Sequence, residues 1–282
     1  MKVEIRYSAD YRYEQKVTFS PHTFRLSPKI DRYVKVRRFD FRTNRDAVVS
    51  WRRDLFDNEI ASVFYPKAAP TLTARFRLLL EIEEKNAFGF LLDDHALRLP
   101  FTYHPQEASV LSPYLSAAPA PVLGFWSPPP EPQPTVDALV ALNEALHGGL
   151  EYERREEGSA RAAEETLRVG RGACRDFAVL LVTILRGLGL AARYASGYLC
   201  EFGEGEKRAE GALHAWVETY LPGAGWVGID PTNGTFCDHH HLTAAVGADM
   251  SDVSPVAGSY YHSKPVSHEL DSTLEIIPHA AR

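Results

Sequence analysis

The sequence predicts an α+β protein in which an antiparallel β-sandwich-like domain precedes a domain of helices packed on an antiparallel sheet. Three observations predict this order: residues 1–104 alternate between apolar and polar side chains, residues 105–134 are rich in proline, and from Thr135 helical spacing gives way to three more alternating runs. Such segregation of strands and helices along a chain is typical of α+β proteins. We therefore divide the chain into an N-terminal β domain (1–104), a proline-rich linker (105–134) and a C-terminal domain (135–282).

The N-terminal domain is predicted from period-two alternation. Its strand-like stretches, which are rich in Tyr, Phe and Val, read VEIRYSADYRYEQKVTFSPHTFRL, DRYVKVRRFDF and TLTARFRLLLEIEE. Their polar residues alternate as a solvated sheet face does, so no catalytic cluster is expected there. In the linker that follows, proline fixes φ and removes hydrogen-bond donors, so we expect neither a stable helix nor a central strand.

The C-terminal domain is predicted to begin with three helices. Thr135 is the expected N-cap of the first, Ser159 caps a second over SARAAEETLRV, and the third starts near Cys174 with a broad apolar face. Gly187 and Gly189 mark the end of this third helix. Three strand-like runs follow, ARYASGYLCEF, LHAWVETYL and GWVGID.

Composition narrows the class of function. Hydrophobic residues at 45% and charged residues at 24% of a 282-residue chain are typical of an ordinary globular protein. The net charge of −6 argues against nucleic acid as a partner. We expect no signal peptide, because the N-terminal stretch MKVEIRYSADYRYEQ lacks the apolar core that one requires. We expect no membrane partner, because no stretch of eighteen apolar residues occurs. Three cysteines are too few for a disulfide framework, which favours reduced thiols and a cytoplasmic location.

Cys174 is the first candidate catalytic residue. It lies at the predicted start of the third helix, where free N–H groups and the helix dipole favour thiolate over thiol. Gly170 and Gly172 leave the backbone room to present amides to a developing oxyanion. Asp176 is expected to stabilise the first turn through the dipole. Taken alone, however, a cysteine on an apolar helix is more often buried packing.

His214 and Asp230 supply the missing partners in HAWVETYLPGAGWVGIDPTNG. A hairpin that turns at PGAG would place both residues near the same end of adjacent strands. The carboxylate can then orient the imidazole, and the imidazole can face the helix that carries Cys174. Alone, His214 would be a structural histidine, and Asp230 before Pro231 would open a turn. Together they favour a catalytic interpretation.

These blocks, followed by DVSPVAGSYY, resemble the bacterial transglutaminase-like superfamily, whose core is papain-like, and in particular the subgroup with an N-terminal β domain. The resemblance spans residues 150–262. It implies that Cys174 is the nucleophile, that His214 is the general base and then the acid, and that Asp230 orients His214. It also implies acyl transfer through a thioester, without a cofactor, from a peptide or glutamine-type amide to water or an amine.

The resemblance further implies oxyanion donors, for which the backbone N–H of Cys174 and the side chain of Tyr152 are the candidates. Trp216 and Trp226 are expected in the core or in the cleft wall; the alternative is that they line the acyl-donor channel. The expected partner is a peptide or protein substrate, and the sequence does not determine the oligomeric state.

Two other classes of function stay open. The core could be a non-catalytic peptide-binding module, although all three catalytic residue types are present. Alternatively, the segment CDHHHL (residues 237–242) could serve a metal-dependent hydrolase. Consecutive residues on a strand point to opposite faces, whereas a tetrahedral site needs converging ligands, so we predict no metal site there.

Overall fold

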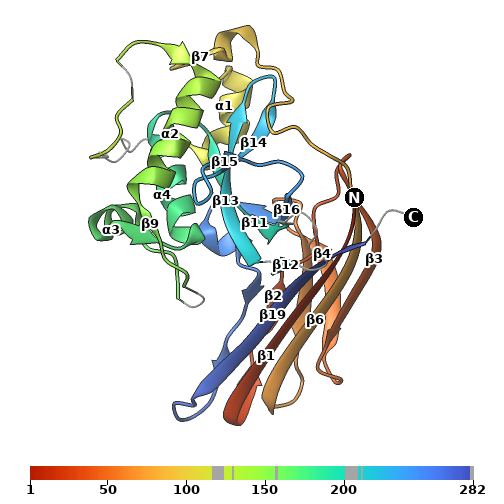
Figure 1. Cartoon of the computed structure of the whole chain (residues 1–282). Coiled ribbons are helices and arrows are strands. Elements are labelled where there is room, and N and C mark those ends of the chain that lie inside the picture. The colour runs from red at the N-terminus through yellow and green to blue at the C-terminus, as the bar shows by residue number, and fades with distance from the viewer. Residues whose placement is uncertain (116–123, 129, 156–157, 201–208, 211, 280–282) are drawn as a thin grey trace.

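The computed structural model describes residues 1–115, 124–128, 130–155, 158–200, 209–210 and 212–279. Long strands form one end of the molecule, and the helices gather at the other (Figure 1). No helix within these ranges is both long and apolar enough to span a membrane.

The N-terminal half consists of two antiparallel sheets. The larger has the order β12-β19-β1-β6-β3, with β18 paired to the end of β1. Its strands are β1 (Lys2–Phe19), β3 (Val34–Thr43), β6 (Ala69–Ile82), β12 (Ala209–Glu210), β18 (Tyr260–Tyr261) and β19 (His268–His279). The smaller, of order β17-β2-β5-β4, comprises β2 (His22–Phe24), β4 (Val48–Arg53), β5 (Glu59–Phe64) and β17 (Val256–Ala257).

The two sheets share one core because their strands alternate. Ile5 on β1 and Leu78 on β6 are register partners, and both are fully buried. Phe24 on β2 lies with its ring centroid 6.1 Å from that of Phe76 and 5.3 Å from that of Phe41. This packing confirms the predicted β-sandwich-like domain.

The helical half is built on a third antiparallel sheet, of order β15-β14-β13-β11-β16. Its strands are β11 (Ala192–Leu199), β13 (Ala212–Leu221), β14 (Gly225–Asp230), β15 (Thr235–Phe236) and β16 (His241–Gly247), and its helices are α2 (Thr135–Gly149), α3 (Ala163–Val169) and α4 (Cys174–Gly187). The apolar face of α4 packs against β13, and α3 packs against α4. Helices on an antiparallel sheet confirm the predicted α+β class.

Shorter elements connect these layers. Strand β7 (Arg98–Leu99) pairs with β8 (Gln133–Pro134), and β9 (Glu151–Tyr152) pairs in parallel with β10 (Arg171–Gly172). The other elements are the helix α1 (Pro105–Leu111) and the 3₁₀ turns η1 (Asp94–Ala96), η2 (Ser112–Tyr114) and η3 (Met250–Val253).

The two halves are interleaved. Strand β19, which lies within the range assigned above to the C-terminal domain, pairs with β1 over its whole length, so the end of the chain returns to the N-terminal sheet (Figure 1). Asn58, just before β5, is fully buried and clamps β16: its side-chain oxygen accepts the Val246 N–H at 2.8 Å, and its amide donates to the Val246 carbonyl at 2.7 Å.

Three local expectations are wrong. Thr135 is the first residue of α2 rather than its cap, and its hydroxyl donates to the Ala96 carbonyl at 2.5 Å. Ser159 caps no helix, because the Arg161 N–H is held by the Asp176 carboxylate and α3 starts only after Ala162. The linker does form a helix, α1, because Pro105 occupies its first position, where no intrahelical donor is needed. Part of the proline-rich stretch, 116–123 and 129, lies outside the described residues.

Candidate active site

Cys174 is the first residue of α4, and a buried carboxylate holds it there. Asp176 is fully buried; one oxygen accepts the Ala173 N–H at 2.8 Å, and the other accepts Arg155 Nη2 at 2.8 Å and the Arg161 N–H at 2.7 Å. Asp176 therefore does more than complement the helix dipole, because it ties the preceding loop to the first turn. The Cys174 side chain stays partly exposed.

The strand before the helix requires glycine. A Cβ on Gly172 would lie only 2.8 Å from the Asp176 Cβ, so no other residue fits without a shift. Gly172 pairs in parallel with Tyr152, which places Tyr152 beside the approach to Cys174. The phenol is half exposed, and burial together with the nearby Cys174 raises its pKa. Tyr152 is therefore a neutral hydroxyl donor next to the thiol.

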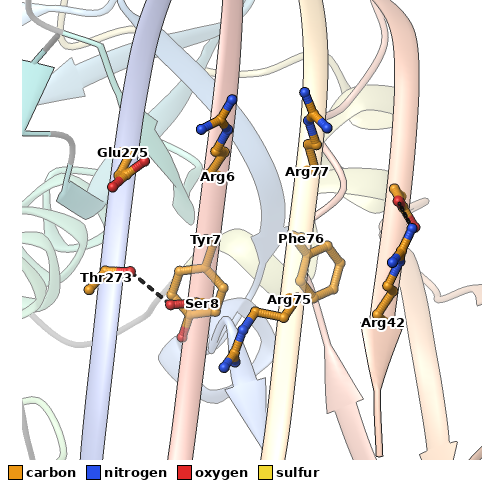
Figure 2. Close-up of a pocket in the computed structure, with 10 residues that line it drawn as sticks. Arg6, Tyr7, Ser8, Arg42, Arg75, Phe76, Arg77, Thr273 and Glu275 are labelled. Carbon is orange, nitrogen blue, oxygen red and sulfur yellow. Dashed lines mark hydrogen bonds and ion pairs between the residues drawn. The ribbon is translucent and has the colours of Figure 1, made fainter. Parts of the chain in front are cut away.

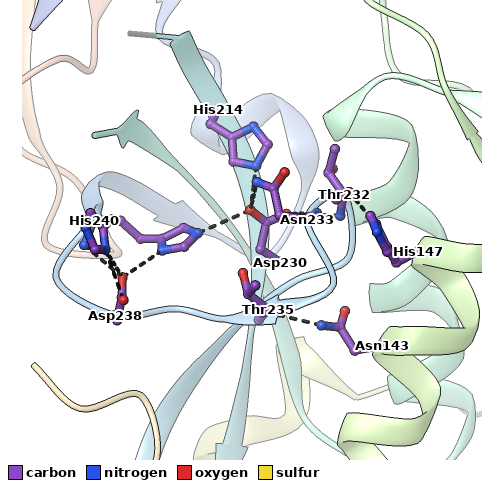
Figure 3. Close-up of polar contacts among 10 residues, drawn as sticks. Asn143, His147, His214, Asp230, Thr232, Asn233, Thr235, Asp238 and His240 are labelled. Atoms are coloured by element: carbon purple, nitrogen blue, oxygen red, sulfur yellow. Dashed lines mark hydrogen bonds and ion pairs between the residues drawn. The ribbon is translucent and has the colours of Figure 1, made fainter. Parts of the chain in front are cut away.

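His214 and Asp230 meet as the hairpin predicts. Strands β13 and β14 pair from Val217↔Ile229 to Leu221↔Gly225, so both residues lie at the end away from the turn. His214 Nε2 lies 2.8 Å from Asp230 Oδ2, and both side chains are buried (Figure 3).

The turn after Asp230 fixes this carboxylate. Its Oδ1 accepts the Thr232 N–H at 3.0 Å, and its Oδ2 accepts the Asn233 side-chain amide at 2.8 Å. Helix α2 pins the same turn, since His147 Nδ1 lies 2.8 Å from the Thr232 carbonyl and Asn143 donates to the Thr235 carbonyl at 3.2 Å (Figure 3).

The other face of the imidazole meets the thiol. Since Nε2 is used by Asp230, Nδ1 is the ring nitrogen left for the hydrogen bond between His214 and Cys174. Burial opposes charge on both groups. For His214, the bonds to Asp230 and Cys174 outweigh burial and raise its pKa from 6.5 to about 10. For Cys174, the bond to His214 outweighs burial and lowers the thiol pKa.

Asp230 completes the electrostatics. Burial alone would raise the pKa of its carboxyl, but the hydrogen bonds from His214 and His241 lower it strongly, so Asp230 is ionised. The three groups thus favour a thiolate and an imidazolium held by a carboxylate, which is the charge distribution of an activated cysteine nucleophile.

Trp216 supports the imidazole. It is 1% exposed, its ring stacks on that of His214 at a centroid distance of 6.2 Å, and His241 meets it edge-on at 5.5 Å. The side chain is therefore a buried wall behind His214. Phe56, from the N-terminal half, packs against the same small core.

Trp226 lies apart from these residues. It faces Tyr220 near the hairpin turn, four residues along β14 from Asp230, a separation of about 13 Å on an extended strand. Arg193 sits over its ring at 4.1 Å, and Tyr114 packs edge-on at 5.0 Å. The structure therefore brings Cys174, His214, Asp230, Tyr152 and Trp216 together and leaves Trp226 at the far end of the hairpin.

Two contacts to Asp230 were missed from the sequence, those of Asn233 and His241. His241 Nε2 lies 3.2 Å from Asp230 Oδ2, and its side chain is 6% exposed. The DPTNG turn is the signal for Asn233, because a side-chain amide three residues after an aspartate can return to it. Nothing local distinguishes His241 from its two histidine neighbours.

A pocket on the outer face of the large sheet carries no part of this site. Arginines line it (Figure 2), but they are paired with carboxylates. Arg75 forms a bidentate pair with Asp10, at 2.7 and 2.6 Å, while Arg77 and Arg6 both bind Glu4, at 2.5 and 2.7 Å. Arginines that are each paired with a carboxylate are an ordinary feature of a sheet face and offer no unpaired charge to a ligand.

Comparison with known proteins agrees with this geometry. Residues 129–231 match the transglutaminase-like superfamily, and residues 3–81 match the bacterial transglutaminase-like N-terminal region. The chain belongs to the transglutaminase-like superfamily. The two matched segments together cover well over half of its length, and the first ends just beyond Asp230. The resemblance inferred from the motif blocks is thereby confirmed.

Two mycobacterial proteins contain a similar segment. Uncharacterized protein ML0607 of Mycobacterium leprae is 34% identical over 141 residues, which cover 49% of each protein. Uncharacterized protein Rv2569c of Mycobacterium tuberculosis is 32% identical over 153 residues, or 52% of this chain and 48% of that protein. The matched region thus spans about half the length of these relatives.

A solved structure shares the whole fold. The crystal structure of a "Putative Cysteine Protease" from Cytophaga hutchinsonii superimposes with a TM-score of 0.60 over 98% of this chain and 97% of that one, at 16% identity. The arrangement of N-terminal sheets and transglutaminase-like core is therefore common to both proteins.

Proposed function

We propose that this transglutaminase-like protein is a cysteine-dependent acyl-transfer enzyme that acts on peptide or glutamine-type amides through a thioester. One observation carries the proposal: His214 is buried between Cys174 and Asp230, hydrogen-bonded to both, in the order that nucleophilic catalysis requires.

In the first half-reaction, the Cys174 thiolate attacks the amide carbonyl carbon and forms the C–S bond, while the C=O electron pair moves onto oxygen. The first N–H groups of α4 have no intrahelical partner, so the Cys174 N–H is one oxyanion donor, and the Tyr152 hydroxyl is the second. When the tetrahedral intermediate collapses, the C–N bond breaks, and the His214 imidazolium gives its proton to the departing amine.

In the second half-reaction, neutral His214 takes a proton from water or from a primary amine as that nucleophile attacks the thioester. Collapse releases an acid or a new amide and returns the thiolate and imidazolium. Asp230 keeps the ring in one orientation and stabilises its charge throughout. No metal or cofactor takes part in any of these steps.

Trapping the acyl-enzyme tests the proposal. The full chain is incubated with a peptide digest of a cell extract, quenched in acid and analysed by mass spectrometry for an adduct on the Cys174 sulfur. We expect an acyl adduct on Cys174 in the native protein, and a fluorescent primary amine added before the quench distinguishes transamidation from hydrolysis.

Cys174→Ala is the test variant, and Cys200→Ala, which removes a buried thiol outside the site, is its matched control. The control should keep the adduct. An absence of any adduct in the native chain, with peptides still bound reversibly, would support the non-catalytic binding module instead. Turnover that is lost after exhaustive EDTA treatment would favour the metal-dependent hydrolase.

A further inference from the structure

The turn that leads into β16 brings a carboxylate and several imidazoles together. Residues 238–240 do not form a strand, so the alternation used above to exclude a metal site does not apply to them. Their side chains converge: ligand atoms of Asp238, His239 and His240 all lie within 4.8 Å of one another. Figure 3 shows the His240 ring against the Asp238 carboxylate.

The distances around Asp238 are close to those of a metal centre. Its carboxylate oxygens lie 3.0 Å from Nδ1 of His240 and 3.9 Å from Nδ1 of His239. Nδ1 of His241, the first residue of β16, lies 3.6 Å from the same carboxylate. Ligand atoms bound to one ion at roughly 2.1 Å in a tetrahedral site are roughly 3.4 Å apart. The ligand atoms of Asp238, His239 and His240 are therefore near the spacing that one ion requires, and His241 Nδ1 lies beside the Asp238 carboxylate.

Two of the three ring nitrogens have no other use in the described part of the chain. His239 Nδ1 and His241 Nδ1 are both buried without a hydrogen-bond partner. Such orphaned acceptors are unusual in proteins unless a water or an ion satisfies them. The rest of the cluster stays open to solvent, since Asp238 is 31% and His240 37% exposed, so an ion can enter.

We propose that Asp238, His239 and His240, with His241 as a fourth donor, bind one divalent transition-metal ion of the Zn²⁺ class. Three imidazoles and one carboxylate suit a borderline-soft ion rather than Ca²⁺ or Mg²⁺, which prefer oxygen ligands.

The proposed metal site is connected to the candidate active site by the imidazole ring of His241, which contacts Asp230. His241 would bind the ion through Nδ1 while Nε2 donates to Asp230 at 3.2 Å, an arrangement in which a carboxylate supports a metal-bound histidine. Asp230 would then serve both the ion and His214. On the basis of the proposed function, a bound cation competes with the His214 imidazolium for this carboxylate, so the ion lowers the reactivity of Cys174.

Zinc binding is measured first on Cys174→Ala, so that the reactive thiol cannot take the metal. Competition with a chromophoric chelator should show one equivalent of Zn²⁺ bound with a Kd of about 1 µM or tighter. Adding His239→Ala and His240→Ala should weaken binding by at least about 100-fold. The control, His262→Ala with His268→Ala, removes two exposed histidines elsewhere and should change nothing. Weak binding in the parent, or equal affinity in all three proteins, overturns the site.

The effect of the bound ion on the reactivity of Cys174 is measured separately. The rate of Cys174 alkylation is compared with and without one equivalent of Zn²⁺. We expect zinc to slow alkylation of the native chain and to leave the His239→Ala/His240→Ala chain unaffected. Equal slowing in both chains would mean that zinc binds the thiol directly, which refutes the coupling. Failure of the proposed function has a different signature, slow alkylation even without zinc.

Discussion

Asp176 positions Cys174, the proposed nucleophile, so replacing Asp176 should lower both the stability of the protein and the reactivity of Cys174. Asp176→Ala deletes an acceptor for Ala173, Arg155 and Arg161 in a position with no exposure to solvent. The buried Ala173 N–H then loses its acceptor, and the mostly buried Arg155 and Arg161 lose their shared carboxylate. Removing one partner of a buried charge network costs roughly 3–5 kcal/mol. For a chain of this size, that corresponds to a fall in Tm of roughly 8–15 °C.

Thermal unfolding followed by circular dichroism measures the first effect, with Glu164→Ala as a control that removes an exposed first-turn carboxylate of α3. The control should change Tm by about 2 °C or less. Below its own Tm, the Asp176→Ala chain should also alkylate Cys174 more slowly, because the loop no longer ties the first turn of α4. A Tm within 3 °C of the native value, with unchanged alkylation, would refute the positioning role of Asp176.

Three further outcomes follow from the same contacts. Tyr152→Phe should lower kcat by roughly 100-fold if its hydroxyl is an oxyanion donor, without slowing iodoacetamide alkylation, which forms no oxyanion; equal kcat would exclude that role. Asn58→Ala should lower the free energy of unfolding by about 2 kcal/mol in urea titrations, since both hydrogen bonds to Val246 are lost. Folding raises the pKa of His214 from 6.5 to about 10, so the free energy of unfolding of the native chain should exceed that of His214→Ala by its full amount below about pH 6.5. This difference should disappear as the pH approaches about 10. A difference that grows with pH would contradict the ion pair.

The local sequence pattern predicts those parts of this site that lie on one helix or within one hairpin. The start of α4 at Cys174 follows from its apolar spacing and the glycines before it, and the β13–β14 hairpin follows from alternation around PGAG. Together these were enough to predict the contact of His214 with Asp230, since a hairpin fixes which residues share an end.

What the sequence did not reveal depends on contacts between distant segments. Strand β19 pairs with β1 although the two strands lie near opposite ends of the sequence. Alternation of apolar and polar residues predicts that a segment is a strand, but it does not predict which strand lies beside it. Asn58 lies in a loop, and its hydrogen bonds to Val246 depend on the packing of the distant strand β16 against that loop. His241 differs from His239 and His240 solely because β16 begins with it, which turns its ring toward Asp230.

The pH dependence of Cys174 alkylation tests most directly whether His214 holds this thiol as a thiolate. Iodoacetamide reacts with thiolates, and an ordinary cysteine, with a pKa of about 8.5, is almost wholly protonated at pH 6. At that pH we predict that Cys174 reacts at least about tenfold faster than free cysteine, and that His214→Ala abolishes the difference. A rate equal to that of free cysteine at pH 6, rising in parallel with it to pH 9, would contradict the thiolate–imidazolium pair.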